Sequence, residues 1–537
     1  MVDVLVIGAG GAGLVAALHA KASGASVKVI SKSYPTRSQT CMAQGGINAA
    51  LSHADIDNVD IHIEDTLKSS QGLASIEAIE MLCREGVEAV QWLDRIGVPF
   101  SRTEDSEIAQ RRLGGATHAR ACYAQDYTGL KILHTLYDQC NKEGIIFYNE
   151  RYLLNLISED NYVGGATALN IKTGEIESYR AKSVILATGG YSRIYGKHST
   201  NATGSTGDGI AAAIRAGAKL SDMEFVQFHP TALKNSSILI SESARGAGGY
   251  LLNKKGERFT DELAPRDKLS QAILEEIENA TGEVFLDIRH LGEHFIDEEL
   301  PQERKLAKLY ENIDPVHDII PIKPVAHYTM GGIAVDNTSQ TALKGLFAVG
   351  ECANHNVHGA NRLGGNSLLE LIVFGKQAGC NASQYAQNSK LTCKDTSQLE
   401  DDKNYISKLY KSSNTIDFYE QRAKMGDIFY QYAGIKRNEK DLTRVLDAMH
   451  KMQLDLALMG PKDSSKIYNT DLMEFIEFSN MVQLAEIVVH CAINRSESRG
   501  AHFRSDAPEK VDEHFKTHTI IYQKEGMLMT QFSVKGE

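Results

Sequence analysis

The chain has 537 residues, of which 42% are hydrophobic and 23% charged; these values are typical of globular proteins and exclude a disordered, coiled-coil or collagen-like chain. At about 150 residues per domain, the length predicts three to four domains. The 69 acidic and 57 basic side chains give a net charge of −12, which argues against nucleic-acid binding, and any anionic substrate would need a local cluster of cations.

The cysteines are far apart along the chain and form no C-x-x-C pair. This spacing indicates no disulfide framework and no zinc or iron–sulfur site, so we expect no bound metal. We expect nearly all of them to be small buried apolar side chains: Cys41, Cys83, Cys122, Cys140, Cys352, Cys380, Cys393 and Cys491. No run approaches the ~18 uninterrupted apolar residues of a membrane span. The stretch 4–18 lacks the basic start of a signal peptide, so we expect a cytoplasmic protein.

The chain begins with a strand–turn–helix–strand unit. An apolar strand is predicted over 2–7, a helix over 14–23 and a second strand over 26–31. Between the first strand and the helix, the glycines at Gly8, Gly10 and Gly13 form a G-x-G-x-x-G turn. Such a turn lets backbone N–H groups approach a pyrophosphate, and its place in this unit predicts a dinucleotide site. Ser31-Lys32-Ser33 stands where NAD-binding chains carry an acidic residue, so NAD is disfavoured.

Two further apolar strands end at small-residue turns, one at 184–190 and the other at 345–351. The second of these ends in the carboxylate of Glu351. Together with the first turn, they indicate FAD held by a large, interrupted α/β domain. We predict a flavoprotein fold of the two-dinucleotide-binding-domain type, with an inserted α+β capping domain and a C-terminal helical domain. The predicted boundaries are 1–231 with 327–385 for the FAD-binding domain, 232–326 for the capping domain, 386–500 for the helical domain and 501–537 for a C-terminal segment. Helices are expected over 442–456 and 473–489.

The ordered motifs of the chain resemble those of one family, the flavoprotein subunits of succinate dehydrogenase and fumarate reductase. The resemblance runs from residue 1 to about 520 and rests on the segments 34–38, 43–47, 206–209, 227–231, 245–249, 264–267, 327–332, 358–368 and 495–502. It implies an FAD cofactor and a mobile capping domain. The FAD contacts that the motifs and the resemblance predict are Gly8, Gly10, Gly11, Gly13, Ser31, Lys32, Ser38, Gln39, Thr40, Gln44, Gly45, Gly46, Ala187, Thr188, Gly189, Asp208, Glu351, Arg362, Asn366, Ser367 and Leu368.

The resemblance also implies a site for a C4 dicarboxylate. His327 and Arg362 would bind one carboxylate, and His229 with Ser241 the other; Arg is well suited to this because it can hydrogen-bond a carboxylate through two N–H groups. Glu242 also belongs to the predicted substrate site. Arg266 would donate the proton, and Glu242 and Arg245 would complete a proton relay, since an arginine is a poor acid unless its proton is replaced.

Gln39 stands where respiratory members of the family carry the histidine that bonds covalently to the flavin. An amide nitrogen is not nucleophilic, so we predict non-covalent FAD and, through a lower flavin potential, a preference for fumarate reduction. The loop 113–118 is shorter than the family pattern, Ser241 replaces a common Thr, and Ala247 interrupts a common Gly-Glu-Gly.

Two other functions are considered. L-aspartate oxidase is a related flavoprotein with non-covalent FAD, but its substrate ammonium needs a nearby carboxylate, and the loop 114–118 contains none. A non-catalytic FAD-binding assembly subunit would be expected to lack part of the relay or of the clamp. The resemblance further implies an iron–sulfur subunit as electron partner and a membrane-associated or heterodisulfide-reductase-like subunit beyond it, which would place the chain at the inner face of the cytoplasmic membrane.

Overall fold

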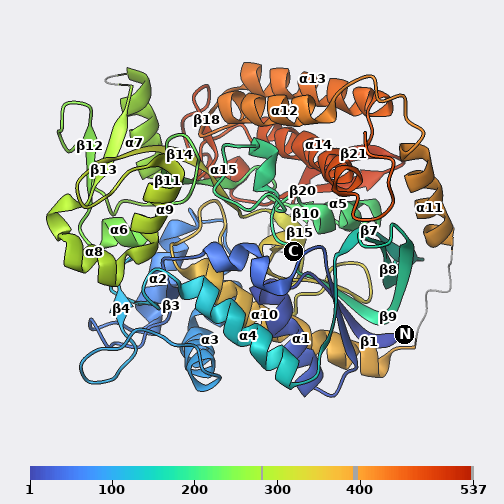
Figure 1. Ribbon diagram of the computed structural model, residues 1–537, viewed down its shortest axis with the longest axis horizontal. Coiled ribbons are helices and arrows are strands. Elements are labelled where there is room, and N and C mark those ends of the chain that lie inside the picture. The colour runs from blue at the N-terminus through green and yellow to red at the C-terminus, as the bar shows by residue number, and fades with distance from the viewer. Residues whose placement is uncertain (280–281, 391–396, 534–537) are drawn as a thin grey trace.

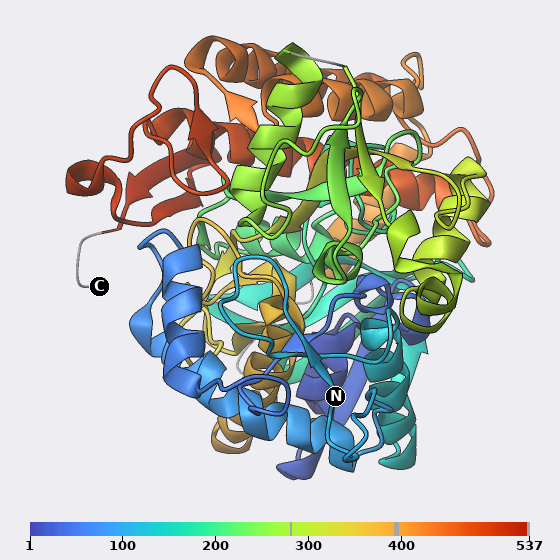
Figure 2. The same cartoon turned by 90° about the vertical axis from the view of Figure 1, so that its left-hand side faces the viewer.

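The computed structural model describes residues 1–279, 282–390 and 397–533. Three groups of elements make up the molecule (Figure 1): a sheet with helices packed on it, a separate four-stranded unit at one end, and a layer of C-terminal helices. Figure 2 brings the four-stranded unit to the front, above the N-terminal elements.

The central sheet has seven strands, with β1 in its interior. The order is β6-β2-β1-β9-β8-β7, and β16 also pairs with β9. β1 pairs in parallel with both β2 and β9, so its apolar residues are buried on both faces, as the sequence predicts. The strands are β1 (Val2–Ile7), β2 (Val27–Ser31), β6 (Ile146–Asn149), β7 (Arg151–Glu159), β8 (Tyr162–Asn170), β9 (Ile176–Leu186) and β16 (Leu346–Ala348).

Helices α1 and α10 pack closely together beside this sheet. A Cβ on Gly379 of α10 would lie 2.3 Å from the carbonyl oxygen of Ala16 on α1, so only glycine permits this approach. Nine of the 12 residues of α1 are buried, which makes it an interior helix. The helices of this part are α1 (Gly11–Ala22), α2 (Val59–Ser69), α3 (Ile76–Arg95), α4 (Thr128–Lys142), α5 (Asp208–Arg215) and α10 (Asn366–Asn388), and a small sheet contains β3 (Ile47–Asn48), β4 (Gln110–Arg111) and β5 (Ala121–Cys122).

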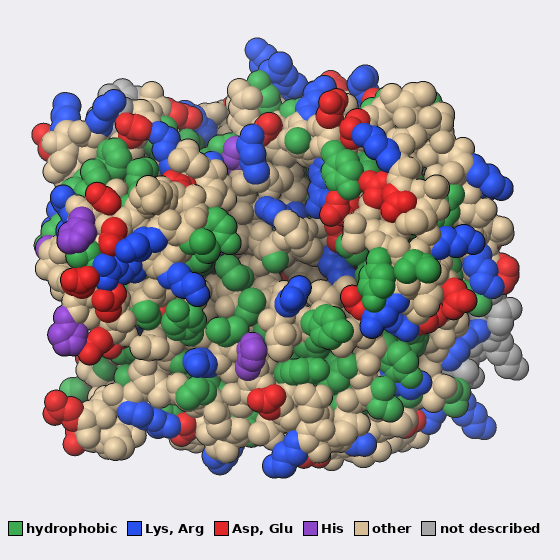
Figure 3. Space-filling view, viewed as in Figure 1, with side chains coloured by type: hydrophobic (Ala, Val, Ile, Leu, Met, Phe, Trp, Pro, Cys, Tyr) green, Lys and Arg blue, Asp and Glu red, His purple; other side chains and the backbone are tan. Residues whose placement is uncertain are grey.

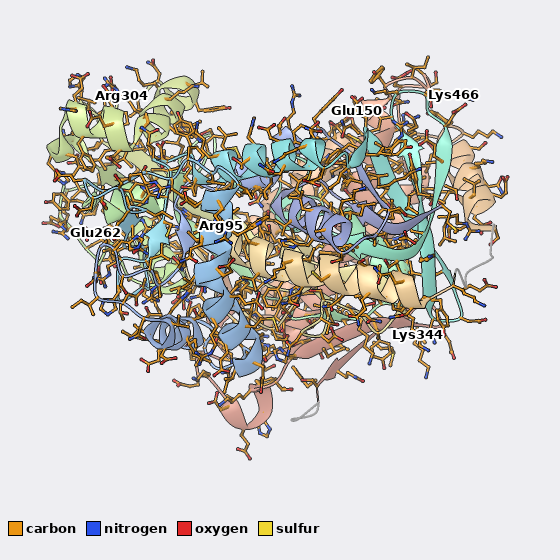
Figure 4. The ribbon with its side chains drawn as sticks, turned by 90° about the horizontal axis from the view of Figure 1, so that it is seen from below. Arg95, Glu150, Glu262, Arg304, Lys344 and Lys466 are labelled. Atoms are coloured by element: carbon orange, nitrogen blue, oxygen red, sulfur yellow. The ribbon has the colours of Figure 1, made fainter. Side chains whose placement is uncertain are left out.

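The four-stranded unit, here called the cap, extends from β11 to β14 and has its own hydrophobic core. Its strands are antiparallel in the order β11-β14-β13-β12. Arg304 ties its helical part together through Asp314 at 3.0 Å and Asp297 at 2.7 Å, and Figure 4 shows Arg304 at this end of the molecule. The elements are β11 (Val226–Leu233), α6 (Glu242–Gly246), β12 (Tyr250–Asn253), α7 (Arg266–Asn279), β13 (Val284–Asp287), α8 (Glu293–Glu299), α9 (Pro301–Glu311) and β14 (Ile320–Thr329). The expected domain boundaries after residues 231 and 326 therefore lie inside two paired strands.

The C-terminal helices include both predicted ones, and each is somewhat longer than its apolar pattern. They are α11 (Ser397–Leu409), α12 (Phe418–Tyr432), α13 (Glu439–Asp455) and α14 (Thr470–Asn494). α14 is long and apolar enough to span a membrane, but 72% of its most apolar 18-residue window is buried inside the protein. Its composition is therefore that of a core helix. The seven described cysteines are unpaired, Cys41 and Cys380 being half-buried and the others buried; Cys393 lies outside the described residues.

The C-terminal segment contributes two strands that the sequence analysis did not predict. β20 (Thr519–Lys524) and β21 (Met527–Phe532) extend a sheet of order β17-β15-β10-β20-β21, whose other strands are β10 (Leu220–Ser221), β15 (Gly332–Ala334) and β17 (Ala353–Asn354). Two ion pairs reinforce this contact: the partly buried His518 has its Nδ1 2.6 Å from Asp222, and the fully buried Arg495 lies 2.6 Å from Glu224. The remaining short elements are β18 (Lys436–Arg437), β19 (Phe503–Arg504) and α15 (Asp512–Phe515).

Candidate active site

A cavity of about 530 Å³ lies where the three groups of elements meet. The turns after β1, β9 and β16 line it, which are the three strand ends that the sequence analysis singled out. Its volume falls within the range of about 300–1,000 Å³ typical of ligand and cofactor pockets. The segments 37–46 and 201–205, the start of α10, the cap, and helices α12 and α14 supply most of the remaining walls. The face shown in Figure 3 is hollowed near its middle, with Lys and Arg side chains around the hollow.

The glycine-rich turn brings two strand ends into contact at the cavity. Gly8 has φ +108°, and a Cβ on it would lie 2.2 Å from the carbonyl oxygen of Ala187. A Cβ on Gly13 would lie 2.0 Å from the carbonyl oxygen of Gly8. Helix α1 starts at Gly11, whose N–H donates to Thr40 Oγ1 at 3.0 Å. The helix N-terminus therefore points its partial positive charge at the cavity, as a bound pyrophosphate requires.

Several polar atoms that line the cavity are buried and have no hydrogen-bond partner in the protein. They are Ser38 Oγ, both amide atoms of Gln44, Thr188 Oγ1 and Asn201 Nδ2. Burying such groups without partners costs free energy. A polar ligand extended along the cavity would satisfy them, so these residues fit FAD.

Two carboxylates mark different parts of this cavity. Glu351 accepts a hydrogen bond from the Thr329 N–H at 3.0 Å, and burial raises its pKa to about 7. Asp208 is bound by Lys32 at 2.6 Å and by the Tyr152 hydroxyl at 2.7 Å. Lys32 also reaches Glu477 of α14 at 2.8 Å. The ion pairs of Lys32 therefore join the C-terminal helices to the cavity wall.

The proposed proton relay is assembled at the cap face of the cavity. Arg266 Nη2 lies 2.6 Å from Glu242 Oε2, and Arg245 Nη2 lies 3.8 Å from Glu242 Oε1. Burial opposes ionisation of Glu242, but the charges of Arg266 and Arg245 outweigh it and hold its pKa below the usual value. Burial lowers the pKa of Arg245. A carboxylate between two guanidinium groups can pass a proton from one to the other.

The loop 113–118 contributes to this relay through its backbone. The Gly114 N–H donates to Glu242 Oε1 at 2.6 Å, and a Cβ on Gly114 would lie 2.3 Å from the same oxygen. The loop thus binds the carboxylate of the proposed relay directly, and the close approach requires a glycine at position 114.

The predicted clamp residues surround the same end of the cavity. The rings of His229 and His327 are 4.9 Å apart, and His327 Nδ1 lies 2.8 Å from Thr200 Oγ1. Burial, together with neighbouring cations, lowers the pKa of both histidines well below the usual value, so both rings are neutral. Arg362 stacks on the Tyr328 ring at 4.3 Å, and its buried Nε has no partner. Burial and the charge of Arg266 lower the pKa of Arg362 to about 10.

Ser241 connects the clamp to the contact between the cap and the rest of the chain. Its hydroxyl accepts from the Ser243 hydroxyl at 2.6 Å, and its N–H donates to Glu303 Oε1 at 2.9 Å. At the start of α9, the Gln302 and Glu303 N–H groups donate to Asp126 Oδ2 at 2.7 and 3.1 Å. Burial raises the pKa of Asp126 to about 6, and burial together with Asp126 raises that of Glu303.

Nearly all the predicted site residues line the cavity; Gly13, Arg245 and Asn366 do not. Gly13 and Arg245 lie one layer behind it, against Gly8 and Glu242. Asn366 is fully buried and hydrogen-bonds Asn48 at 2.7 Å and His62 at 3.0 Å, so it fixes the start of α10.

Other functional residues were missed. Gln227 accepts from Arg266 at 3.0 Å and donates to the Arg362 carbonyl at 2.8 Å. It lies two residues before His229 on β11, so strand alternation could have revealed it. Nothing in the sequence pattern signals Arg422 and Glu477, which reach the cavity from the C-terminal helices.

Comparisons with known proteins agree with this geometry. The family description "FAD binding domain" matches residues 3–368, and "Fumarate reductase flavoprotein C-term" matches residues 422–535. The succinate dehydrogenase flavoprotein subunit of Rickettsia bellii is 40% identical, over 96% of this chain and 92% of that protein. The fumarate reductase flavoprotein subunit of Haemophilus influenzae is 37% identical, over 98% and 92%.

The fold is also similar to that of a solved structure. A variant of E. coli quinol fumarate reductase FrdA superposes with a TM-score of 0.94 at 36% identity, covering 99% of this chain and 96% of that chain. The predicted family and fold class are confirmed. The chain belongs to the family of succinate dehydrogenase and fumarate reductase flavoprotein subunits.

Proposed function

We propose that the chain is the catalytic flavoprotein subunit that interconverts fumarate and succinate. The observation that carries this proposal is the juxtaposition of Arg266, Glu242 and Arg245 with the His229, His327 and Arg362 side chains around one end of an FAD-sized cavity. In a chain of net charge −12, this is the local cationic site that a dianionic substrate requires. FAD, when bound, supplies or accepts the hydride.

The clamp residues bind and orient the substrate. Arg362 and His327 take one carboxylate, and His229 with Ser241 takes the other. The unpartnered Arg362 Nε and the neutral imidazoles can all donate hydrogen bonds there. Because the cavity end is buried, these donors act with little competition from water. Their contribution is positioning and charge stabilisation.

Arg266 moves the proton. Its guanidinium is held by Glu242 on one side and Gln227 on the other, which leaves it fixed at the cavity wall. After Arg266 has given its proton to the substrate, Arg245 supplies a replacement proton through Glu242. The cap carries all three relay residues, so the relay faces the substrate only while the cap is in place over the cavity.

The relatives and the site favour this reaction over L-aspartate oxidation. The relatives named above are fumarate reductase and succinate dehydrogenase subunits. The ammonium group of L-aspartate would need a nearby carboxylate, and Glu242, the carboxylate of the relay, is already bound by Arg266 and by the Gly114 N–H. We expect the FAD-loaded protein to reduce fumarate with a chemical electron donor and to show no oxidation of L-aspartate. Turnover of L-aspartate without turnover of fumarate would overturn the proposal. A complete relay and clamp also speak against a non-catalytic assembly subunit.

We propose that FAD is bound without a covalent bond. Gln39 lines the cavity, and its Oε1 accepts from the Ala202 N–H at 2.6 Å, so its amide is engaged in a hydrogen bond. Acid precipitation should release all of the yellow chromophore into the supernatant. Colour retained on the washed pellet would contradict the proposal.

We also propose that the protein prefers fumarate reduction to succinate oxidation. The reason is that FAD without the covalent bond would have a lower reduction potential. A flavin potential lower by about 30 mV changes the two-electron equilibrium by about 1.4 kcal/mol. The rate of fumarate reduction should exceed that of succinate oxidation with acceptors at quinone potential. The opposite ratio would refute this preference without affecting the assignment of the reaction.

We propose that electrons reach the flavin from an iron–sulfur subunit, which in turn joins a membrane-associated or heterodisulfide-reductase-like subunit at the cytoplasmic face. The proposal rests on the family, and on described cysteines that are single and mostly buried. Affinity purification of the native protein should recover a partner with cysteine motifs for iron–sulfur clusters. Recovery of the active chain alone from gently lysed cells would oppose it.

A further inference from the structure

Two histidines and a glutamate converge on the outer layer of C-terminal helices, away from the cavity. They are His450 on α13 and Glu486 and His490 on α14. One ligand atom from each lies within 4.8 Å of the other two, and His450 Nε2 is 3.2 Å from Glu486 Oε1. Among the residues that the structure describes (1–279, 282–390 and 397–533), this is the one group of three His, Cys, Asp or Glu side chains whose ligand atoms lie this close to one another.

The helices hold these side chains in register. Glu486 and His490 are spaced i and i+4, so they lie one above the other on one face of α14. On α13, Met449 and Met452 are buried on either side of His450 in the sequence, so the helix packing fixes its backbone. The His450 side chain is 51% exposed and that of Glu486 20%. The cluster therefore lies at the solvent edge of a rigid helix–helix interface.

The donor set selects the kind of ion. Two imidazole nitrogens and one carboxylate oxygen suit Zn²⁺ and similar transition metals, whereas Mg²⁺ and Ca²⁺ prefer oxygen ligands alone. Imidazole must be neutral to bind a metal. Zn²⁺ bonds of about 2.0–2.2 Å require the side chains to close around the ion, and the exposed His450 has the freedom to do so.

We propose that His450, Glu486 and His490 form a Zn²⁺-binding site that links α13 to α14, with water as the fourth ligand. None of the three residues lines the cavity. The same helix α14 reaches the cavity through Met473, Glu474 and Glu477, so the ion braces the outer end of a helix whose other end forms part of the cofactor wall. The site acts on stability and takes no part in the reaction.

The test uses the FAD-loaded protein after chelator treatment, with Zn²⁺ and Co²⁺ as probes. Titration calorimetry should show one Zn²⁺ per chain, and Co²⁺ should give the absorption spectrum of a site with nitrogen and oxygen ligands. His450→Gln and Glu486→Gln should each weaken Zn²⁺ binding at least tenfold. Zn²⁺ should raise the Tm of the unmodified protein and leave that of His450→Gln unchanged. Mg²⁺ at the same concentration should leave the Tm of both proteins unchanged.

His294 provides a matched control. It lies on α8, 83% exposed, with Nδ1 3.3 Å from Glu298 in the same i and i+4 arrangement but without a second histidine. His294→Gln should leave Zn²⁺ affinity and stoichiometry unchanged. The proposal is overturned if no Zn²⁺ binds at tens of micromolar, or if His294→Gln weakens binding as much as His450→Gln. Because His450 is exposed, its variant should fold normally, and fumarate reduction should be unaffected.

Discussion

Arg266 is the residue on which the proposed chemistry depends most. It is 7% exposed and held by hydrogen bonds to Glu242 and Gln227. Replacing it with Ala should lower kcat for fumarate reduction by about 10²–10⁴-fold, the range for loss of a general acid. FAD content should not change. Arg289→Ala is a control in the same cap, because Arg289 is 46% exposed and pairs only locally, with Asp287. Equal effects of the two substitutions would contradict the role of Arg266.

Gly114 is a second test at this scale. A methyl group there would displace the Glu242 carboxylate, so Gly114→Ala should lower kcat by at least tenfold while the flavin spectrum and Tm stay close to those of the unmodified protein. Steady-state kinetics at saturating fumarate would show the effect. Unchanged kcat would mean that Glu242 can relay protons from another position.

Individual residues also show how far the sequence alone could lead. His229, His327 and Arg362 were identified through motifs, and the fold brings them together. The hydrogen bond from the Gly114 N–H to Glu242 was not predictable, because a backbone donor leaves no signal in the pattern of side chains. Gly13 and Asn366 were predicted as FAD contacts but do not line the cavity. A motif cannot distinguish a residue that contacts a ligand from one that supports such a residue.

At the scale of elements, the start of α9 is the most informative contact. Asp126 accepts hydrogen bonds from two backbone N–H groups of this cap helix. The other oxygen of its carboxyl group, Oδ1, and Glu303 Oε2 are buried and have no hydrogen-bond partner. Arg111 is the neighbouring cation, but its guanidinium donates to the Gly45 and Gln44 carbonyls. The two carboxyl groups therefore repel each other when both are ionised.

This arrangement predicts a pH effect. Because the folded-state pKa of Asp126 is raised to about 6, the folded protein binds a proton that the unfolded chain releases near pH 4. Stability should therefore fall as pH rises from about 4 to about 6, by on the order of 3 kcal/mol. Asp126→Asn should flatten that part of the profile. Thermal unfolding at pH 4.5, 5.5, 6.5 and 7.5 measures it; parallel profiles for the two proteins would be the contrary result.

Elements with a continuous apolar run, such as β1 and α14, or with an amphipathic helical pattern, such as α13, were predictable, whereas β20 and β21 were not. Both C-terminal strands are partly exposed, and their sequences, TIIYQK and MLMTQF, do not alternate between apolar and polar residues. Their partner β10 is two residues long and lies about 300 residues earlier in the chain. Pairing over such a distance is set by tertiary contacts rather than by local pattern.

At the scale of the whole molecule, Lys32 ties two distant parts of the chain together at the cofactor cavity. It pairs with Asp208 and with Glu477 of α14, both of them buried. Lys32→Met would leave the buried Asp208 carboxylate without its cation and Glu477 with only Arg422, at 3.8 Å; loss of one partner of a buried ion pair costs about 3–5 kcal/mol. FAD affinity should fall at least tenfold and Tm should drop.

The matched control for this prediction is Lys172→Met. Lys172 is 42% exposed and pairs with Glu150 at 3.1 Å, and neither residue lines the cavity. Figure 4 shows Glu150 at the edge of the molecule, in the half away from the cap. Fluorescence titration with FAD and thermal unfolding would compare the two variants. Similar FAD affinities would show that α14 does not contribute to cofactor binding.

The strands β11 and β14 join the cap to the rest of the molecule, and they also carry His229 and His327. They are paired side by side, with a register shift just after His229. The backbone that connects the cap to the rest of the molecule therefore also carries two of the proposed substrate ligands. His327 is held outside the cap by Thr200, so we expect a tilt of the cap to move His229 relative to His327 and Arg362. On the proposed roles of these residues, we therefore expect opening of the cap and release of the product to be coupled.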